Sequence, residues 1–157
     1  MDIEDELDLF VIGDAQQYLF FKAGGDIYAF DVADVSEMIE YQTLTKVPMM
    51  APFVKGVTNI RGSIVPVIDL LERFSLGQTT IGDKTSLIIV DNMALIIDEV
   101  HDVSSIVEED IKESLEFGFK IAQHFIKNMA KYNDSYIAIL NAQEILNIDE
   151  LSILEGD

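Results

Sequence analysis

The feature that most constrains the fold of this chain is an internal repeat of strand, turn and strand. Shifting the chain by 72 residues aligns Phe53–Phe74 with Phe125–Leu146 without a gap, and the apolar positions match almost throughout. Both copies are dense in β-branched and aromatic residues, which favour pleated, half-buried strands. A repeated unit of this kind predicts two similar β subdomains.

The first copy predicts two strands, Val54–Ile60 and Ser63–Leu70, joined across a tight corner at Arg61-Gly62. Proline has no backbone N–H to donate to a ladder, so Pro66 is expected at a sheet edge or a bulge. In the second copy the corner is Asn133-Asp134, which is still a turn but carries no cation. If both copies fold alike, folding needs no arginine at this corner, and Arg61 becomes a candidate for a role beyond folding.

A second difference between the copies is the replacement of Gly56 by Asn128. Asparagine tolerates a positive φ better than most residues other than glycine. We therefore expect the two positions to share a backbone conformation.

The rest of the chain predicts mostly short strands, the pattern of β-barrels or a sandwich. The glycine pair Gly24-Gly25 between two apolar runs is a hairpin signal. Near-helical spacing of apolar residues predicts a short helix over Val32–Tyr41, and Asp69 is expected to cap a helix. Further strands are expected at Ser86–Val90, Met93–Ile97, Val100–Val107, Phe125–Ala130 and Ser135–Leu140, and a closing helix at Ala142–Ile148.

The charge of the chain disfavours two classes of binding partner. It has 157 residues, enough for one domain with a sizeable core, and a formal net charge of −19 from 10 basic and 29 acidic residues. Binding to a phosphate backbone or an anionic membrane surface relies on clustered lysine and arginine, so nucleic acid and lipid are poor partners. The acidity either serves solubility or favours basic partner surfaces.

The ends and apolar runs of the sequence indicate a soluble, cytoplasmic protein. The acidic start lacks the basic region of an export signal, and no apolar run approaches the roughly 20 residues that span a bilayer. Cysteine is absent, which excludes disulfides and thiolate metal sites.

Catalytic motifs are missing from the sequence. It contains no phosphate-binding loop, dinucleotide fingerprint or nucleophile elbow. His101 lies near Asp98 and Asp102, which is compatible with a metal or acid–base pair, although a strand histidine at a solvated edge is the simpler interpretation. We expect no catalytic residue, no metal and no cofactor.

The run GVTNIRGSIVPVIDL, with PFVK before it and Val35-Ser36-Glu37-Met38 upstream, closely resembles the chemotaxis coupling proteins of the CheW family. The resemblance extends from about Gln16 to Ile148. It implies a mainly β fold of two SH3-like, five-stranded barrels that pack on a hydrophobic seam, with short helices. The implied organisation is an acidic arm over 1–15, one domain of two intertwined barrels over 16–150 and a tail over 151–157.

The resemblance also implies a function. Such proteins are non-catalytic adaptors that link chemoreceptors to the CheA histidine kinase, and they reach the membrane only through these partners. They bind the cytoplasmic tip of the receptor in the groove between the barrels, and the kinase through its own CheW-like regulatory domain. The alternatives are the CheW-like domain of a CheV-type coupling protein, which is fused to a receiver, or of the kinase itself, and more remotely a small acidic enzyme using carboxylates or His101.

Site residues are carried over where this sequence matches the motifs of the family. A Glu37–Arg61 ion pair is expected at the rim of the receptor groove, where it would orient the guanidinium. Glu37 could instead be solvated surface, and Gly56 could serve only a backbone bend. The receptor-groove positions are Val35, Glu37, Gly56 and Arg61, and the kinase contacts are expected on exposed strands around Val90 and Leu95.

Overall fold

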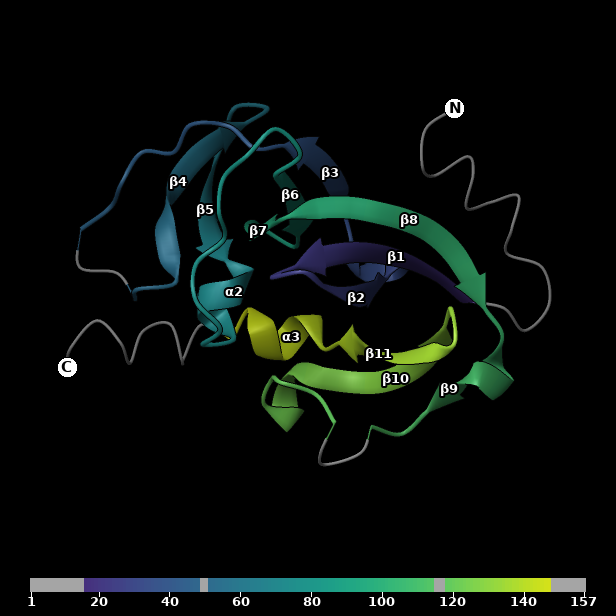
Figure 1. The fold of residues 1–157 in the computed structure, drawn as a ribbon. Coiled ribbons are helices and arrows are strands. Elements are labelled where there is room, and N and C mark those ends of the chain that lie inside the picture. The colour runs from purple at the N-terminus through teal and green to yellow at the C-terminus, as the bar shows by residue number, and fades with distance from the viewer. Residues whose placement is uncertain (1–15, 49–50, 115–117, 148–157) are drawn as a thin grey trace.

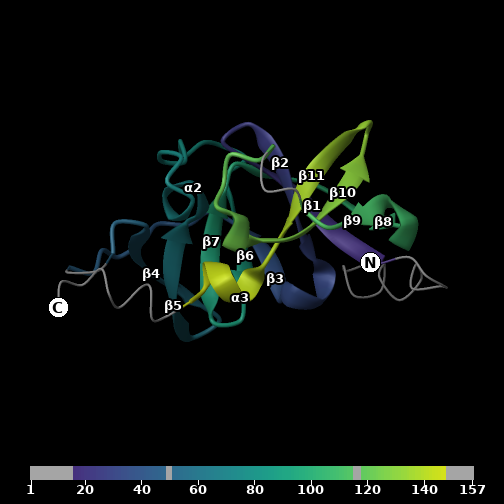
Figure 2. The same cartoon turned by 90° about the horizontal axis from the view of Figure 1, so that it is seen from below.

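The computed structural model describes residues 16–48, 51–114 and 118–147, which form two sheets lying side by side (Figures 1 and 2). Sheet A contains, in spatial order, β8 (Glu99–Ile106), β1 (Gln16–Ala23), β2 (Asp26–Asp31), β11 (Ser135–Leu140), β10 (Ile126–Tyr132) and β9 (Ile111–Lys112). Sheet B contains β3 (Glu37–Glu40), β6 (Ser86–Val90), β7 (Met93–Ile97), β5 (Ser63–Asp69) and β4 (Val54–Ile60). The helical elements are η1 (Val32–Asp34), α2 (Leu70–Arg73), η2 (Glu108–Asp110), η3 (Gln123–Phe125) and α3 (Ala142–Ile145).

The predicted fold class is confirmed, with one difference. Sheet B has the expected five strands, whereas sheet A has a sixth, the two-residue strand β9, which the sequence did not predict. Strand pairs are antiparallel except β5 with β7 and β2 with β11.

The repeat is confirmed strand for strand. Strands β10 and β11 begin 72 residues after β4 and β5, and both hairpins show a register shift at the same place in the first strand. Asp69 and Asn141 then cap α2 and α3 with their side chains, as predicted for Asp69. The hairpins are exchanged, however: β1–β2 lies in sheet A with β10–β11, and β6–β7 lies in sheet B with β4–β5. Each sheet therefore takes strands from both halves of the chain.

The helix predicted over Val32–Tyr41 is wrong. Asp31 caps only the single 3-10 turn η1, accepting the N–H of Ala33 at 2.9 Å, and the chain then enters β3. Met38 packs on the core between the sheets, whereas Ile39 packs inside sheet B. Apolar neighbours on opposite faces of one strand produced the spacing that resembled a helix.

Asn128 does not share the conformation of Gly56, contrary to expectation. Gly56 has a φ of +151°, whereas Asn128 is not among the described residues with positive φ. Both strands are flanked at the next position, β4 by Thr45 at Val57 and β10 by β9 at Met129. At Gly56 the flanking chain lies so close that a Cβ would be 2.4 Å from the carbonyl oxygen of Thr45, and this approach requires glycine. The predicted closing helix also ends early, at Ile145, and Ile148 lies outside the described residues.

The prediction of an edge or a bulge at Pro66 is wrong, because β5 lies between β4 and β7 and the register shift of this hairpin is at Val54 and Gly56. The partner of Pro66 on β4 is Val57, whose N–H and C=O bond to Thr45 and not to β5. In a non-hydrogen-bonded antiparallel pair such as this one, both residues turn their backbone N–H and C=O away from each other. The nitrogen of Pro66 therefore faces the β7 side. Pairing with β7 begins only at Val67, and no donor is needed at Pro66.

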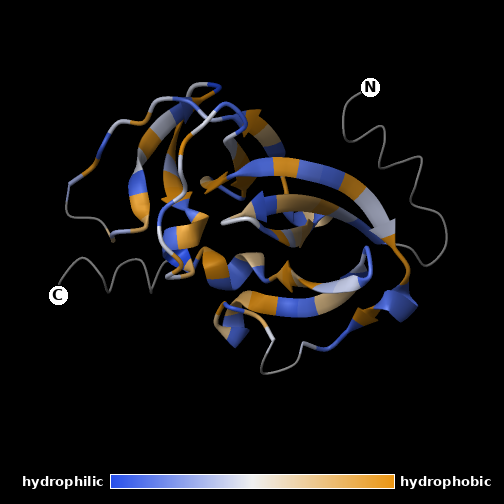
Figure 3. Cartoon of the chain, viewed as in Figure 1, coloured by the Kyte–Doolittle hydropathy of each residue, from blue (hydrophilic) through white to orange (hydrophobic). Residues whose placement is uncertain are grey.

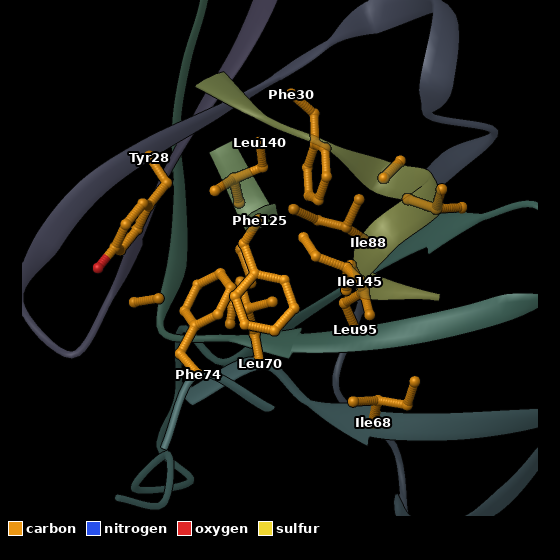
Figure 4. Packing of buried hydrophobic residues seen from close by; sticks show 14 of the residues in the cluster. Tyr28, Phe30, Ile68, Leu70, Phe74, Ile88, Leu95, Phe125, Leu140 and Ile145 are labelled. Atoms are coloured by element: carbon orange, nitrogen blue, oxygen red, sulfur yellow. The ribbon is translucent and has the colours of Figure 1, made fainter. Parts of the chain in front are cut away.

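The central strands are buried on both faces. In β6, Ile88 and Val90 pack in the cluster between the sheets, which we call the seam, while Leu87 and Ile89 pack inside sheet B. Figure 4 shows seam residues from both sheets around the rings of Phe74 and Phe125, and Figure 3 shows apolar residues in strands of both sheets. The seam includes residues of both sheets and of both α-helices: Leu19, Phe21, Phe30, Ile68, Leu70, Phe74, Ile88, Leu95, Phe125, Leu140 and Ile145.

Val90 and Leu95, where the kinase contacts are predicted, do not have the exposure expected of them. Val90 is 2 % exposed and Leu95 is fully buried, both within the seam. Val90 directly precedes the Asp91-Asn92 turn and Leu95 lies in the middle of β7, and both side chains pack in the seam between the sheets.

Arg73 joins α2 to α3 across the seam. Its Nε donates to the carbonyl of Ile145 and its Nη2 to that of Glu144, both at 2.9 Å. The guanidinium carbon lies 5.0 Å from the ring centre of Phe53 and 4.8 Å from that of Phe125. A planar cation suits this position because it can stack on two rings while donating in its own plane.

Replacing Arg73 by lysine keeps the charge but removes the planar fork, so at least one buried carbonyl loses its donor. We expect the free energy of unfolding, measured with urea, to fall by about 2 kcal/mol. Arg61→Lys at an exposed arginine is the control and should change it by less than about 0.5 kcal/mol. Equal losses for both variants would contradict the role assigned to Arg73.

Candidate functional site

Arg61 is presented to solvent by the turn between β4 and β5. Arg61 and Gly62 have φ values of 53° and 86°, the left-handed conformations that a tight two-residue hairpin requires. The N–H of Gly62 donates to Oδ1 of Asn59 at 2.9 Å, which fixes the turn. The arginine side chain is 80 % exposed. The turn therefore holds a cation outside the sheet.

The expected pair between Glu37 and Arg61 is present, with 3.0 Å between Nη2 and Oε1. Glu37 begins β3, at one edge of sheet B, whereas Arg61 follows β4, at the other edge. The contact therefore joins the two edges of the sheet. An ion pair this exposed contributes about 0–1 kcal/mol to stability, so its main effect is to orient the guanidinium.

The same edges are joined by backbone hydrogen bonds. Thr45 and Val57 exchange N–H···O bonds of 2.9 and 2.8 Å, and Nε2 of Gln42 donates to Oγ1 of Thr58 at 2.6 Å. Next to this bridge Gly56 is buried, and a Cβ built on it would lie 2.4 Å from the carbonyl oxygen of Thr45. Gly56 thus permits the close approach that closes sheet B, and it offers no side chain to a ligand.

Val35 lies on the same edge of sheet B, between η1 and β3. The following residue, Ser36, donates its N–H to the carbonyl of Ile89 at 2.8 Å, which ties this segment to β6. Val35 is half-buried and packs against the seam. Continuing the register of β3 with β6 places Val35 opposite Asp91, at the turn between β6 and β7.

A hollow of about 340 Å³ opens at this turn, where Asp91, Asn92 and Met93 face Leu146 after α3. Met93 also packs against the seam, so the hollow lies at its mouth. Desolvation, and after it the neighbouring Asp31 carboxylate, raise the pKa of Asp34 in η1. Sequence reasoning missed Met93 and Leu146, which carry no signal beyond their apolarity. The mouth of the seam is thus apolar at its floor and acidic at its rim.

Sheet A closes by a different contact at the matching place. Tyr132 occupies the repeat position of Ile60, and burial, together with the Asp102 carboxylate to which it bonds, raises its pKa. Its ring stacks on Phe20 with centroids 4.1 Å apart and meets the edge of His101 at 6.2 Å. The second copy therefore lacks the arginine, but its Tyr132 joins β10 to the edge strand β8 through Asp102.

The described residues give no support to catalytic chemistry at His101. They contain no group of three histidine, cysteine or acidic side chains that could hold a metal ion. His101 is exposed and meets an aromatic ring. Nor does the described part of the chain contain a helix long and apolar enough to cross a membrane.

Comparisons with known proteins agree on one family. Residues 17–150 match the family model of the CheW-like domain. The chemotaxis protein CheW of Klebsiella aerogenes is 27 % identical over 90 % of this chain and 87 % of that protein. The chemotaxis protein CheW of Bacillus subtilis is 31 % identical, over 84 % of this chain and 87 % of that protein.

A solved structure is similar as well. The scaffolding protein CheW of Thermoanaerobacter tengcongensis superposes with a TM-score of 0.78 at 31 % identity, covering 85 % of this chain and 93 % of that one.

The closing role of Gly56 can be tested by substitution. Gly56→Ala adds a Cβ against the Thr45 carbonyl, whereas Gly62→Ala has no atom within 4 Å and incurs only backbone strain. We expect Gly56→Ala to lower the free energy of unfolding by at least about 1 kcal/mol more than Gly62→Ala. Thermal denaturation of both variants measures the difference, and equal losses would show that closure does not depend on Gly56.

Proposed function

The chain belongs to the CheW family of chemotaxis coupling adaptors, and on that premise we propose how it joins its two partners. The cytoplasmic tip of a chemoreceptor binds at the Arg61 corner and along the mouth of the seam. The CheA histidine kinase binds through its CheW-like regulatory domain at the ends of the two sheets.

The observation that carries the receptor proposal is the geometry of Arg61. The side chain of Arg61 is 80 % exposed, yet the turn fixes its backbone. Oε1 of Glu37 lies 3.0 Å from Nη2 and orients the guanidinium. A pre-oriented guanidinium binds carboxylates and carbonyls at a low entropic cost. Val35 supplies apolar surface beside it, so the corner suits a helical hairpin with mixed polar and apolar side chains. Gly56 acts indirectly, by closing the sheet that carries the corner.

A different pair of residues supports the kinase proposal. Ile64 on β5 and Tyr136 on β11 occupy the same position of the repeat and are 65 % and 47 % exposed. Large apolar side chains at matching places on both sheets favour contact with a partner built from the same repeat. These positions replace the buried Val90 and Leu95 as candidate kinase contacts.

The remaining properties follow from this function. CheW-family proteins are scaffolds, and we propose that this chain acts without catalysis, cofactor or metal. It works in the cytoplasm and reaches the receptor arrays at the membrane through its protein partners. The net charge of −19 disfavours nucleic acid. The relatives named chemotaxis protein CheW favour the coupling protein over a CheV-type protein or a kinase regulatory domain.

Replacing Arg61 by alanine should weaken binding of a receptor-tip fragment roughly tenfold or more, because a charge-assisted hydrogen bond is lost. The thermal midpoint should stay nearly unchanged. Asn133→Ala is the matched control, since it places alanine at the equivalent left-handed position of the other sheet and should leave receptor binding intact. A large loss of stability for Arg61→Ala, or equal binding losses for both variants, would refute the receptor site.

The kinase surface has a separate test. Ile64→Asp and Tyr136→Asp should each reduce co-sedimentation with the regulatory domain of the kinase, because each places a charge in an apolar contact. Receptor binding should be unaffected. Val107→Asp, at another exposed apolar residue (43 %), is the control. Kinase binding that survives both substitutions would exclude this surface.

A further inference from the structure

A second hollow, of about 620 Å³, lies on sheet B beside the beginning of β4. We call it the lysine groove. Its walls are the segment after β3, strand β4 and the connector after α2. The apolar lining includes Val47 and Ile81, which are 38 % and 48 % exposed. We propose that segment 148–157 of this same chain docks in the lysine groove.

The groove is preformed, because the buried Asp69 fixes its connector wall. One oxygen of this carboxylate accepts the N–H of Leu71 at 3.1 Å and the hydroxyl of Thr79 at 2.7 Å. The other accepts the N–H of Thr79 at 2.8 Å. Asp69 therefore holds the connector against α2, and the opening does not depend on a ligand.

The lining of the groove includes two lysines in an otherwise acidic molecule. Lys46 and Lys55 both line it, although the chain has only ten basic residues against 29 acidic ones. Nζ of Lys55 is held 2.6 Å from Glu72, whereas Lys46 is exposed. The exposed ammonium of Lys46, beside the exposed apolar side chains of Val47 and Ile81, favours a peptide that carries carboxylates between apolar side chains.

Segment 148–157 has this composition. Its sequence, IDELSILEGD, contains four acidic and four apolar aliphatic residues and no basic one. Arg73 binds the carbonyl of Ile145 and stacks on Phe53, the residue before the groove-lining Val54. The chain thus leaves α3 beside β4, and ten residues can extend about 33 Å.

The other acidic, apolar stretch of the chain, residues 1–15, joins the described part of the chain far from the groove. Strand β1 begins at Gln16, opposite Ile106 in sheet A, at the far side of the molecule from the groove (Figure 1). The position of the last described residues therefore selects the C-terminal segment. In this arrangement the segment covers the exposed Val47 and Ile81.

Nuclear magnetic resonance of the full-length, ¹⁵N-labelled chain tests this proposal without receptor or kinase, so its outcome is independent of the proposed function. Leu151→Asp combined with Leu154→Asp should displace the segment and shift the amide resonances of Leu44, Val47 and Ile81. Ser152→Asp, which keeps the apolar side chains, should leave them in place. Unchanged groove resonances in the double variant would overturn the proposal.

A synthetic peptide of residues 148–157 gives the complementary measurement. It should bind the double variant, reverse the shifts of the groove resonances and lose at least tenfold in affinity when Lys46→Glu is added. Lys131→Glu, at an exposed lysine on sheet A, is the matched control and should bind the peptide as before. Equal affinity for the Lys46→Glu and Lys131→Glu proteins, or no binding at all, would contradict docking in the lysine groove.

Discussion

The fold depends on strands that bury both faces. Each sheet curves around its own apolar cluster and also presents an apolar face to the other sheet, so Leu87 and Ile88, although adjacent in the chain, belong to different cores. Burying a side chain of this size contributes roughly 1.5–3 kcal/mol, and the seam contains such residues from both sheets. Exchanging hairpins between the halves of the chain makes the two sheets inseparable.

The candidate site exists because sheet B is closed. Gly56 allows Thr45 to bridge to Val57, and the Glu37–Arg61 pair joins the same two edges at the surface. Little energy is stored in that pair, which leaves the guanidinium free to exchange Glu37 for a group of a partner. Sheet A closes through Asp102 and Tyr132 instead. The two corners are therefore alike in architecture and different in chemistry.

Much of this fold could be predicted from the sequence, because turns and repeats are local signals. The bounds of β4, β6, β7 and β11 and the N-cap at Asp69 agree with prediction. The exchange of hairpins could not be predicted, since a 72-residue similarity is the same whichever sheet a hairpin joins. The burial of Val90 and Leu95 could not be predicted, because β6 and β7 are short apolar strands and nothing local shows that both of their faces are covered. The role of Arg73 was missed because its partners are two backbone carbonyls far along the chain and two aromatic rings. Contacts of this kind leave no pattern in the sequence.

In the proposed function, the Arg61 corner and the mouth of the seam form the receptor-docking surface. Titrating an unlabelled receptor-tip hairpin into the ¹⁵N-labelled protein tests it most directly. If the receptor docks there, the amide resonances of Val35, Glu37, Arg61 and Met93 shift and those of the Asn133 corner do not. Shifts confined to the Asn133 corner, or to residues remote from the seam, would contradict it.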